Sequence, residues 1–266
     1  MASNHTNSII GHYISDRLRP FFAELLPLMS PEAKKALTKR YQILLERLRS
    51  AEYHFDKASE SVQLIAVSKT YPADHVQAVA ELGQLHFGEN QLQDAMRKIP
   101  VLANLGLIWH FIGPIQSNKC RDVARYFHWV HSVDRFKIAD RLSQLRPAGS
   151  QPLNVLLQVN IQDEATKAGV APEGIAKLAE AVASRTNIRL RGLMAIPAPE
   201  TGMDRQREVF RYMRHLLHQT NHTLGLQMDC LSMGMTDDME AAVAEGATHV
   251  RIGTAIFGPR QTPAQG

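Results

Sequence analysis

Short apolar segments alternate with amphipathic segments along most of this chain. The apolar runs are rich in β-branched and aliphatic residues and predict buried strands, whereas apolar residues three and four apart between them predict helices. The first strand is expected at 62–67, and a helix follows it at 73–82. The remaining predicted strands cover 86–88, 108–112, 129–132, 153–159, 190–194, 228–231 and 249–252. Asp134 follows the strand at 129–132 and is expected to cap the next helix.

A further helix is predicted before the first strand. Ser30 suits its cap, Pro31 its first turn, and Glu32 its amino-terminal end. One face of this helix is apolar and comprises Leu37, Tyr41, Leu44, Leu45 and Leu48. Prolines divide the preceding segment into short pieces. We therefore expect an N-terminal extension over residues 1–30 and one domain over residues 31–266.

Strands that alternate with helices in this way indicate a parallel sheet covered by helices. Eight such strands, within roughly 250 residues, favour a closed (β/α)8 TIM barrel with its functional site at the carboxyl ends of the strands. An open, doubly wound sheet is the alternative. It is less favoured because the sequence lacks the GxGxxG turn that is typical of dinucleotide-binding sheets.

Composition narrows the possible classes of function. The 266 residues carry a formal net charge of only +4, and the basic residues are spread along the chain. Their densest cluster recurs at helical spacing and is interpreted as a solvated helix face, not a nucleic-acid surface: Lys34, Lys35, Lys39 and Arg40. No apolar segment is long enough to span a membrane, and no signal peptide opens the chain.

Cysteine and histidine patterns point away from disulfide and metal chemistry. Cys120 and Cys230 lie far apart without metal-ligand spacing, which indicates reduced thiols in a cytoplasmic protein. The twelve histidines include no HExxH motif. His215 and His218 are expected on a helix surface, so no metal site is predicted.

Lys69 is the most informative polar residue, because it follows the first apolar strand. Burying an ammonium group is costly unless it is paired or neutral. A neutral lysine amine can attack an aldehyde and form a Schiff base. The plain alternative is a lysine that extends to solvent or pairs with a carboxylate such as Glu89.

Loops that contain the small residues Gly234, Gly253 and Thr254 follow the last two predicted strands. Ser232, Met233 and Gly234 come after the seventh, and Gly253 with Thr254 after the eighth. Such loops allow close approach of the backbone to an anion, and phosphate sites recur at these two positions of the barrel. Alternatively, the glycines only turn the chain.

Arg251 is unusual within an apolar strand, because its guanidinium needs an acceptor there. A ligand with a phosphate, an aldehyde that meets Lys69 and a ring nitrogen that faces Arg251 would satisfy all three sites. Pyridoxal 5′-phosphate has these three features.

Long sequence motifs resemble the pyridoxal phosphate homeostasis protein family. They begin with Ala-Val-Ser-Lys-Thr at 66–70 and Phe-Gly-Glu-Asn at 87–90, and continue with Trp-His-Phe-Ile-Gly-Pro-Ile-Gln-Ser-Asn-Lys at 109–119. The later motifs lie at 159–161, 167–169, 191–197, 232–242 and 251–258. Together they cover roughly residues 35 to 258.

The resemblance implies a fold-type-III barrel similar to the N-terminal domain of alanine racemase, without its second β domain. It implies that Lys69 holds the cofactor as an internal aldimine, with Asn90 beside the ring. Arg251 would face the ring nitrogen, and the loops with Ser232, Met233 and Gly234 and with Gly253 and Thr254 would hold the phosphate. The implied role is storage and delivery of the vitamer and balance of amino-acid and keto-acid pools, without an established turnover reaction.

This sequence differs from the family pattern in two places, and this limits which residue roles can be carried over. Gln91 stands where the family often has an aromatic residue, so no acid/base role is assigned there, and the first thirty residues lie outside most of the match. We expect a cytoplasmic, monomeric carrier of pyridoxal phosphate, with amino acids and apoenzymes as partners and neither nucleic acid nor membrane. The alternatives are a single-domain racemase-like enzyme, with His110 as a candidate acid/base, a lysine Schiff-base aldolase, or an interaction module that has lost its ligand.

Overall fold

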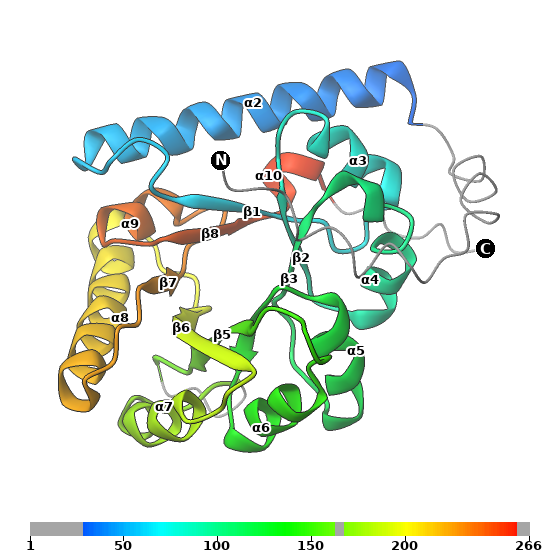
Figure 1. The fold of residues 1–266 in the computed structure, drawn as a ribbon. Helices are drawn as coiled ribbons and strands as arrows, with labels where there is room; N and C mark the ends of the chain where they lie inside the picture. Colours follow the sequence, from blue (N-terminus) through cyan, green and yellow to red (C-terminus); the bar gives the residue numbers. More distant parts are fainter. Residues whose placement is uncertain (1–28, 163–167, 260–266) are drawn as a thin grey trace, which may run out of the picture.

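The eight strands form a closed barrel in which each pairs in parallel with the next and β8 pairs with β1. This computed structural model describes residues 29–162 and 168–259, so the predicted extension over 1–30 lies almost entirely outside the described residues. Figure 1 shows the strands in the centre with helices around them. The predicted TIM barrel is therefore confirmed.

The strands lie close to the predicted positions. Their bounds are β1 Gln63–Val67, β2 His86–Glu89, β3 Ile108–Phe111, β4 Trp129–Val133, β5 Leu153–Val159, β6 Ile188–Ala195, β7 Cys230–Ser232 and β8 His249–Ile252.

Helices occupy the segments between strands. They are α2 Pro31–His54, α3 Ala73–Ala80, α4 Leu92–Lys98, α5 Cys120–Tyr126, α6 Phe136–Leu145, α7 Ile175–Ala183, α8 Met203–Leu224, α9 Met239–Ala244 and α10 Thr254–Phe257. Short 3₁₀ turns at Ala103–Leu105, Ser117–Lys119 and Pro172–Gly174 precede a strand or a helix.

Helix α2 begins as predicted but has more contacts than a solvated face would make. The Ser30 side chain accepts a hydrogen bond from the Ala33 N–H at 3.2 Å and so caps the helix. The buried residues of the predicted apolar face pack on the barrel, and α2 lies along α3, α9 and α10 (Figure 1). Arg40, expected in solvent, is half-buried and donates to the carbonyl of Ile256 at 2.9 Å.

One predicted helix cap is wrong. Asp134 was expected to cap α6, but the cap position is Arg135 and no side chain bonds there. The Asp134 carboxylate instead accepts two hydrogen bonds from the Arg135 guanidinium, at 2.7 and 2.8 Å. Both bonds come from Nη1 of Arg135, and the pair is partly exposed, so it occupies the Asp134 carboxylate while adding little stability.

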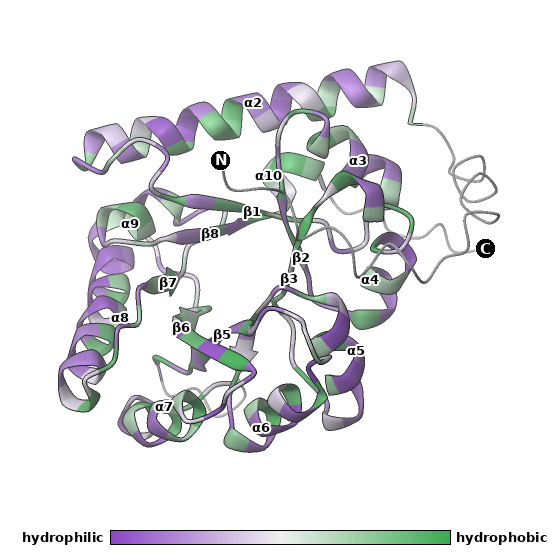
Figure 2. Cartoon of the chain, in the orientation of Figure 1, coloured by the Kyte–Doolittle hydropathy of each residue, from purple (hydrophilic) through white to green (hydrophobic). Residues whose placement is uncertain are grey.

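The core divides into two apolar clusters. The larger packs the outward faces of the strands against the helices, whereas the smaller lies inside the barrel and comprises Trp129, Leu156, Met194 and Cys230. Figure 2 shows apolar and hydrophilic colour mixed along both the strands and the helices. The barrel interior is therefore only partly apolar, and buried polar side chains fill the rest.

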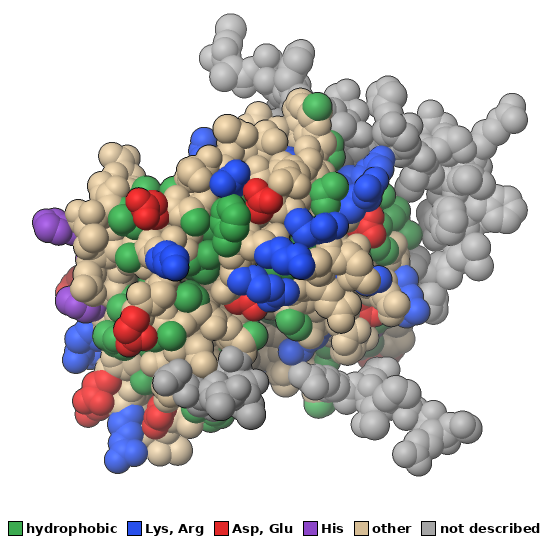
Figure 3. All heavy atoms as spheres, turned by 90° about the horizontal axis from the view of Figure 1, so that it is seen from below, with side chains coloured by type: hydrophobic (Ala, Val, Ile, Leu, Met, Phe, Trp, Pro, Cys, Tyr) green, Lys and Arg blue, Asp and Glu red, His purple; other side chains and the backbone are tan. Residues whose placement is uncertain are grey.

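The surface is mixed in charge. On the face in Figure 3, lysine and arginine side chains lie among acidic and apolar ones. Among the described residues, no helix is both long and apolar enough to cross a membrane.

Candidate functional site

Lys69 lies two residues beyond β1 at the carboxyl end of the barrel and is half-buried. Side chains alternate along a strand, so Lys69 follows Ile65 and Val67 on the side that faces the barrel interior. Thr70, the next residue, has φ +69°, a left-handed conformation that is unusual for a β-branched residue. Such strain persists only where the surroundings enforce it, and it clusters at functional sites.

The loop that follows Lys69 is fastened to the end of α10. The Tyr71 hydroxyl donates to the carbonyl of Gly258 at 2.7 Å, and the Tyr71 ring stacks on Phe257 with centroids 5.0 Å apart. The Thr70 N–H donates to Asp94 at 3.2 Å. Lys69 is therefore held between β1 and the loop after β8.

Asn90 follows β2 and is half-buried. A Cβ on Gly113 would lie 2.0 Å from the Asn90 carbonyl oxygen, so the loops after β2 and β3 pack backbone to backbone. Because β1 pairs with β2, Asn90 and Lys69 lie on neighbouring strand ends.

A buried ion pair, which sequence reasoning missed, joins the same two strand ends. Lys98 of α4 donates to Glu89 and to the carbonyl of Ser68, both at 2.6 Å, and Ser68 donates to the same Glu89 oxygen. Burial raises the pKa of Glu89, and the Lys98 ammonium opposes that rise. Lys98 thus fixes the residues directly before Lys69 and Asn90, from the outer side of the barrel.

The loop after β7 brings its backbone close to α9. Gly234 has φ +95°, and a Cβ there would lie 2.6 Å from the Cβ of Ala242, so only glycine fits. The Gly234 carbonyl accepts from the Arg251 N–H at 3.0 Å. Met233 is buried, and its N–H already donates to the carbonyl of His249 at 3.1 Å.

The loop after β8 lies against β1. A Cβ on Gly253 would lie 3.1 Å from the Val67 carbonyl oxygen, and the exposed Thr254 begins α10. This arrangement places the Gly253 loop beside the strand that carries Lys69.

Arg251 is 4% exposed and lies in register with Ile65, below Lys69 on the neighbouring strand. Its guanidinium donates to the Ser232 hydroxyl at 2.7 Å and to the carbonyl of Ala195 at 2.9 Å. Burial lowers the pKa of Arg251 to about 10, and the charge of Asp238 opposes that fall, although no carboxylate of the described ranges forms an ion pair with Arg251. The two bonds use two of five N–H donors, so donors remain for a ligand.

The Ser232 side chain contacts residues inside the barrel, which its predicted role in a phosphate loop did not indicate. Its side chain points into the barrel, where it contacts Arg251 and also lies 2.8 Å from Nδ1 of His131. His131 contacts His110, and His110 contacts His86. Inward positions of β2, β3 and β4 carry these three histidines, so strand alternation would have revealed them. His110 is a fully buried core residue, whereas His215 and His218 are exposed as predicted.

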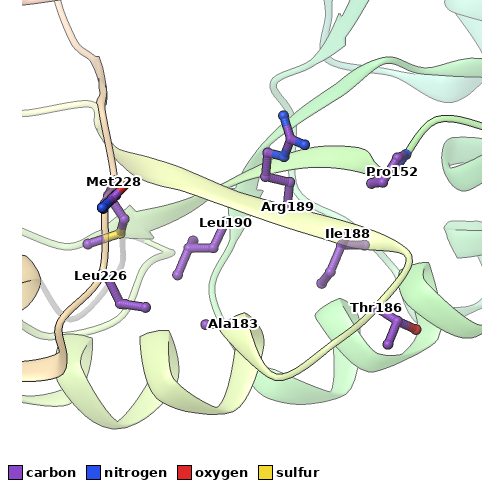
Figure 4. Close-up of a pocket in the computed structure, with 9 residues that line it drawn as sticks. Pro152, Ala183, Thr186, Ile188, Arg189, Leu190, Leu226 and Met228 are labelled. Atoms are coloured by element: carbon purple, nitrogen blue, oxygen red, sulfur yellow. The ribbon is translucent and has the colours of Figure 1, made fainter.

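A surface hollow of about 390 Å³ lies at the opposite end of the barrel (Figure 4). It is lined near the amino ends of β5, β6 and β7, by residues that include Pro152, Ile188 and Met228. None of the predicted site residues lines it. The eight predicted residues instead lie around the carboxyl ends of β1, β2, β7 and β8, where such barrels carry their sites.

Comparison with known proteins identifies the family of this chain. The model of the alanine racemase N-terminal domain family matches residues 43–261. A pyridoxal phosphate homeostasis protein of Pseudomonas aeruginosa is 56% identical over 214 residues, which are 80% of this chain and 91% of that protein. The protein of that name from Escherichia coli K12 is 49% identical over 218 residues, which are 81% and 93% of the two chains.

A solved structure shows the same fold. PipY of Synechococcus elongatus PCC7942, with pyridoxal phosphate bound, superposes with a TM-score of 0.71 at 35% identity, covering 80% of this chain and 99% of that one. The chain described here therefore belongs to the pyridoxal phosphate homeostasis protein family, and its barrel is that of the alanine racemase N-terminal domain.

Proposed function

We propose that this protein binds pyridoxal 5′-phosphate at the carboxyl end of the barrel and serves in cellular homeostasis of that cofactor. It would store and deliver the cofactor and balance amino-acid and keto-acid pools, without robust turnover. The observation that carries the proposal is the convergence of Lys69, Arg251 and two glycine loops on adjoining strands. The names of the relatives and the ligand of PipY support it.

The residues present fit each part of the cofactor. We assign the anionic end to the backbone around Gly234, Gly253 and Thr254, because the Met233 N–H is already donated to His249. Ser232 would contribute through its backbone, since its hydroxyl contacts Arg251 and His131. Asn90, on the strand end beside Lys69, is assigned a place at the ring.

The cofactor supplies an aldehyde and an electron-withdrawing ring when bound. Lys69 would hold the aldehyde carbon covalently and release it when another amine takes its place. Arg251 can donate a hydrogen bond but cannot realistically give up a proton, so it would leave a facing ring nitrogen unprotonated. An unprotonated ring is a weak electron sink, and this favours a carrier over a catalyst.

Partners and location follow from the same proposal. Amino acids and apoenzymes carry the amines that would take the cofactor from Lys69. The proposed carrier is a monomer. Cys120 and Cys230 are both buried free thiols, as suits a cytoplasmic protein.

Substitution of the lysine tests the proposal. Purified wild-type protein should be yellow, and Lys69→Ala should abolish the visible absorbance of covalently held cofactor. Lys119→Ala is the matched control, because Lys119 lies beyond β3, which does not pair with the strand that carries Lys69, and its loss should leave the absorbance unchanged. Full absorbance in Lys69→Ala, or its loss in Lys119→Ala, would contradict the assignment.

The match to an alanine racemase domain makes racemase-like activity the second candidate. His110, the acid/base candidate from the sequence, is fully buried and bonded to two other histidines, which disfavours it as a proton carrier to a substrate. Incubation with amino acids in deuterated water distinguishes the two. A carrier should leave the α-proton in place, whereas a racemase should exchange it at every turnover.

A further inference from the structure

A column of side chains runs through the barrel interior from Arg251 to the amino end of β2. After the contact between Arg251 and Ser232, the Ser232 hydroxyl lies 2.8 Å from Nδ1 of His131. Nε2 of His131 lies 2.9 Å from Nδ1 of His110, and Nε2 of His110 lies 2.9 Å from Nδ1 of His86. All members except His86 are almost completely buried.

Arg251 sets the direction of these hydrogen bonds. A guanidinium can only donate, so the Ser232 oxygen accepts from it. The Ser232 proton then has one available acceptor among the described residues, which is Nδ1 of His131. His131 must carry its proton on Nε2 and donate to His110, which in turn must donate from Nε2 to His86.

The surroundings keep the three imidazoles neutral, as this order requires. Burial is the main cause that lowers the pKa of His86 to about 4 and the pKa values of His110 and His131 well below the usual range. The other groups that face the column add positive charge or potential positive charge: His249, His128 and Arg251. A protonated ring would therefore lie in a barrel that already holds a buried cation.

We propose that Arg251 and Ser232 impose the Nε2–H tautomer on His131, His110 and His86, and that this ordered column in turn positions the Arg251 guanidinium. Every lone pair in the column points toward Arg251, so the column stabilises its charge, to which the negative charge of Asp238 also contributes. These histidines and Ser232 are positioning residues for the arginine. Their relevance to the cofactor ring rests on the proposed function, whereas the order of the tautomers does not.

The reversed order has a specific defect. If every imidazole carried its proton on Nδ1, Ser232 would accept from both Arg251 and His131. Its own proton would then have no acceptor among the described residues, and an unsatisfied buried hydroxyl is disfavoured. We expect this defect to favour the proposed order by about tenfold or more.

Nitrogen NMR of the histidine rings in cofactor-free wild-type protein tests the order directly. With ¹⁵N-labelled histidine at neutral pH, each of the three rings should show a protonated Nε2 and a bare Nδ1. Histidine-to-glutamine variants, made one position at a time, assign the signals. A proton on Nδ1 of His131 or His110, or a doubly protonated ring, would overturn the proposal.

Two variants of Ser232 test the link to Arg251. Ser232→Ala should remove the roughly tenfold tautomer preference of His131 and raise the dissociation constant for pyridoxal phosphate by about tenfold. Ser232→Thr keeps the hydroxyl and should restore both. Unchanged tautomers and affinity in Ser232→Ala would refute the link.

These measurements distinguish the proposal on cofactor binding from the proposal on the histidine column. The spectrum of the wild-type protein tests the order of the tautomers even if Ser232→Ala does not fold. Failure of the wild type to bind the cofactor contradicts the proposed function only. Binding together with the wrong tautomers contradicts the column only.

Discussion

The backbone of Thr70 is strained, and this strain accompanies the position of Lys69 at the end of β1. It is exposed, and its φ of +69° suits glycine or asparagine better than a β-branched residue. The Thr70 N–H bond to Asp94 and the Tyr71 contacts with α10 hold this turn in place. The strain is thus coupled to the geometry that directs Lys69 toward the barrel mouth.

Replacing Thr70 by asparagine should relieve the strain. We expect Thr70→Asn to raise the free energy of unfolding by about 1 kcal/mol, because asparagine tolerates the left-handed region. Urea denaturation measures the change. Thr70→Val is the control, since a second β-branched residue should give no gain. A Thr70→Asn variant less stable than wild type would mean that the turn is not strained.

Some of the candidate site residues could be found from the sequence because they lie at strand ends. Lys69, Asn90, Gly234 and Arg251 were located by counting strands, and the family motifs agreed. The Lys98–Glu89 pair and the histidine column were missed, because each depends on contacts between side chains far apart in the chain. The assignment of individual residues to the cofactor stays a prediction.

The two glycine loops illustrate what elements contribute to the site. Helix α2 braces both from outside: Arg40 bonds the end of α10, and Arg47 bonds Glu240 of α9 at 2.7 Å. Strand pairing places the Gly253 loop against β1, and Gly234 lets the loop after β7 pack on Ala242. The loops are therefore fixed by the elements behind them.

Two glycines with nearly the same positive φ allow the cost of backbone strain to be separated from the cost of close packing. Gly234 has φ +95° with Ala242 in the way, whereas Gly83 has φ +96° and open space around it. Gly83→Ala should cost about 1 kcal/mol of unfolding free energy, from backbone strain alone. Gly234→Ala should cost a further 1–3 kcal/mol or so, because Ala242 must move. Equal losses in urea denaturation would contradict the close packing.

Strand and helix positions were predictable because each strand is a short apolar run and each helix has an apolar face. The side chains that cap the helices were harder to predict. Asp134 was expected to cap α6 but pairs with Arg135, and Asp238 accepts from the Met235 N–H at 2.6 Å without a side-chain bond to α9. Caps depend on which competing partner lies nearest, and local sequence does not specify this.

The molecule as a whole buries several histidines without a carboxylate partner, and this makes its stability depend on pH. Burial lowers the pKa of His86, His128 and His249 to about 4, from an ordinary value of 6.5. Between these two values the unfolded chain binds protons that the folded chain does not. The free energy of unfolding should therefore be constant above about pH 6.5 and fall as the pH falls toward 4.

Each such histidine should contribute a slope of up to about 1.4 kcal/mol per pH unit in that window. His249→Gln should reduce the slope of unfolding free energy against pH by about this amount. His218→Gln, at an exposed position, is the control and should leave the slope unchanged. A stability that does not change between pH 6.5 and 4 would contradict neutral burial of these rings.

The central claim is that the amine of Lys69 holds pyridoxal phosphate at the mouth of the barrel. Mass spectrometry of the borohydride-reduced, digested holoprotein tests it most directly, because reduction makes the lysine linkage permanent. We predict the cofactor-derived mass on the peptide that contains Lys69 and on no other lysine peptide. A modification at Lys119 or Lys167 instead, or no modification of any lysine, would contradict the account.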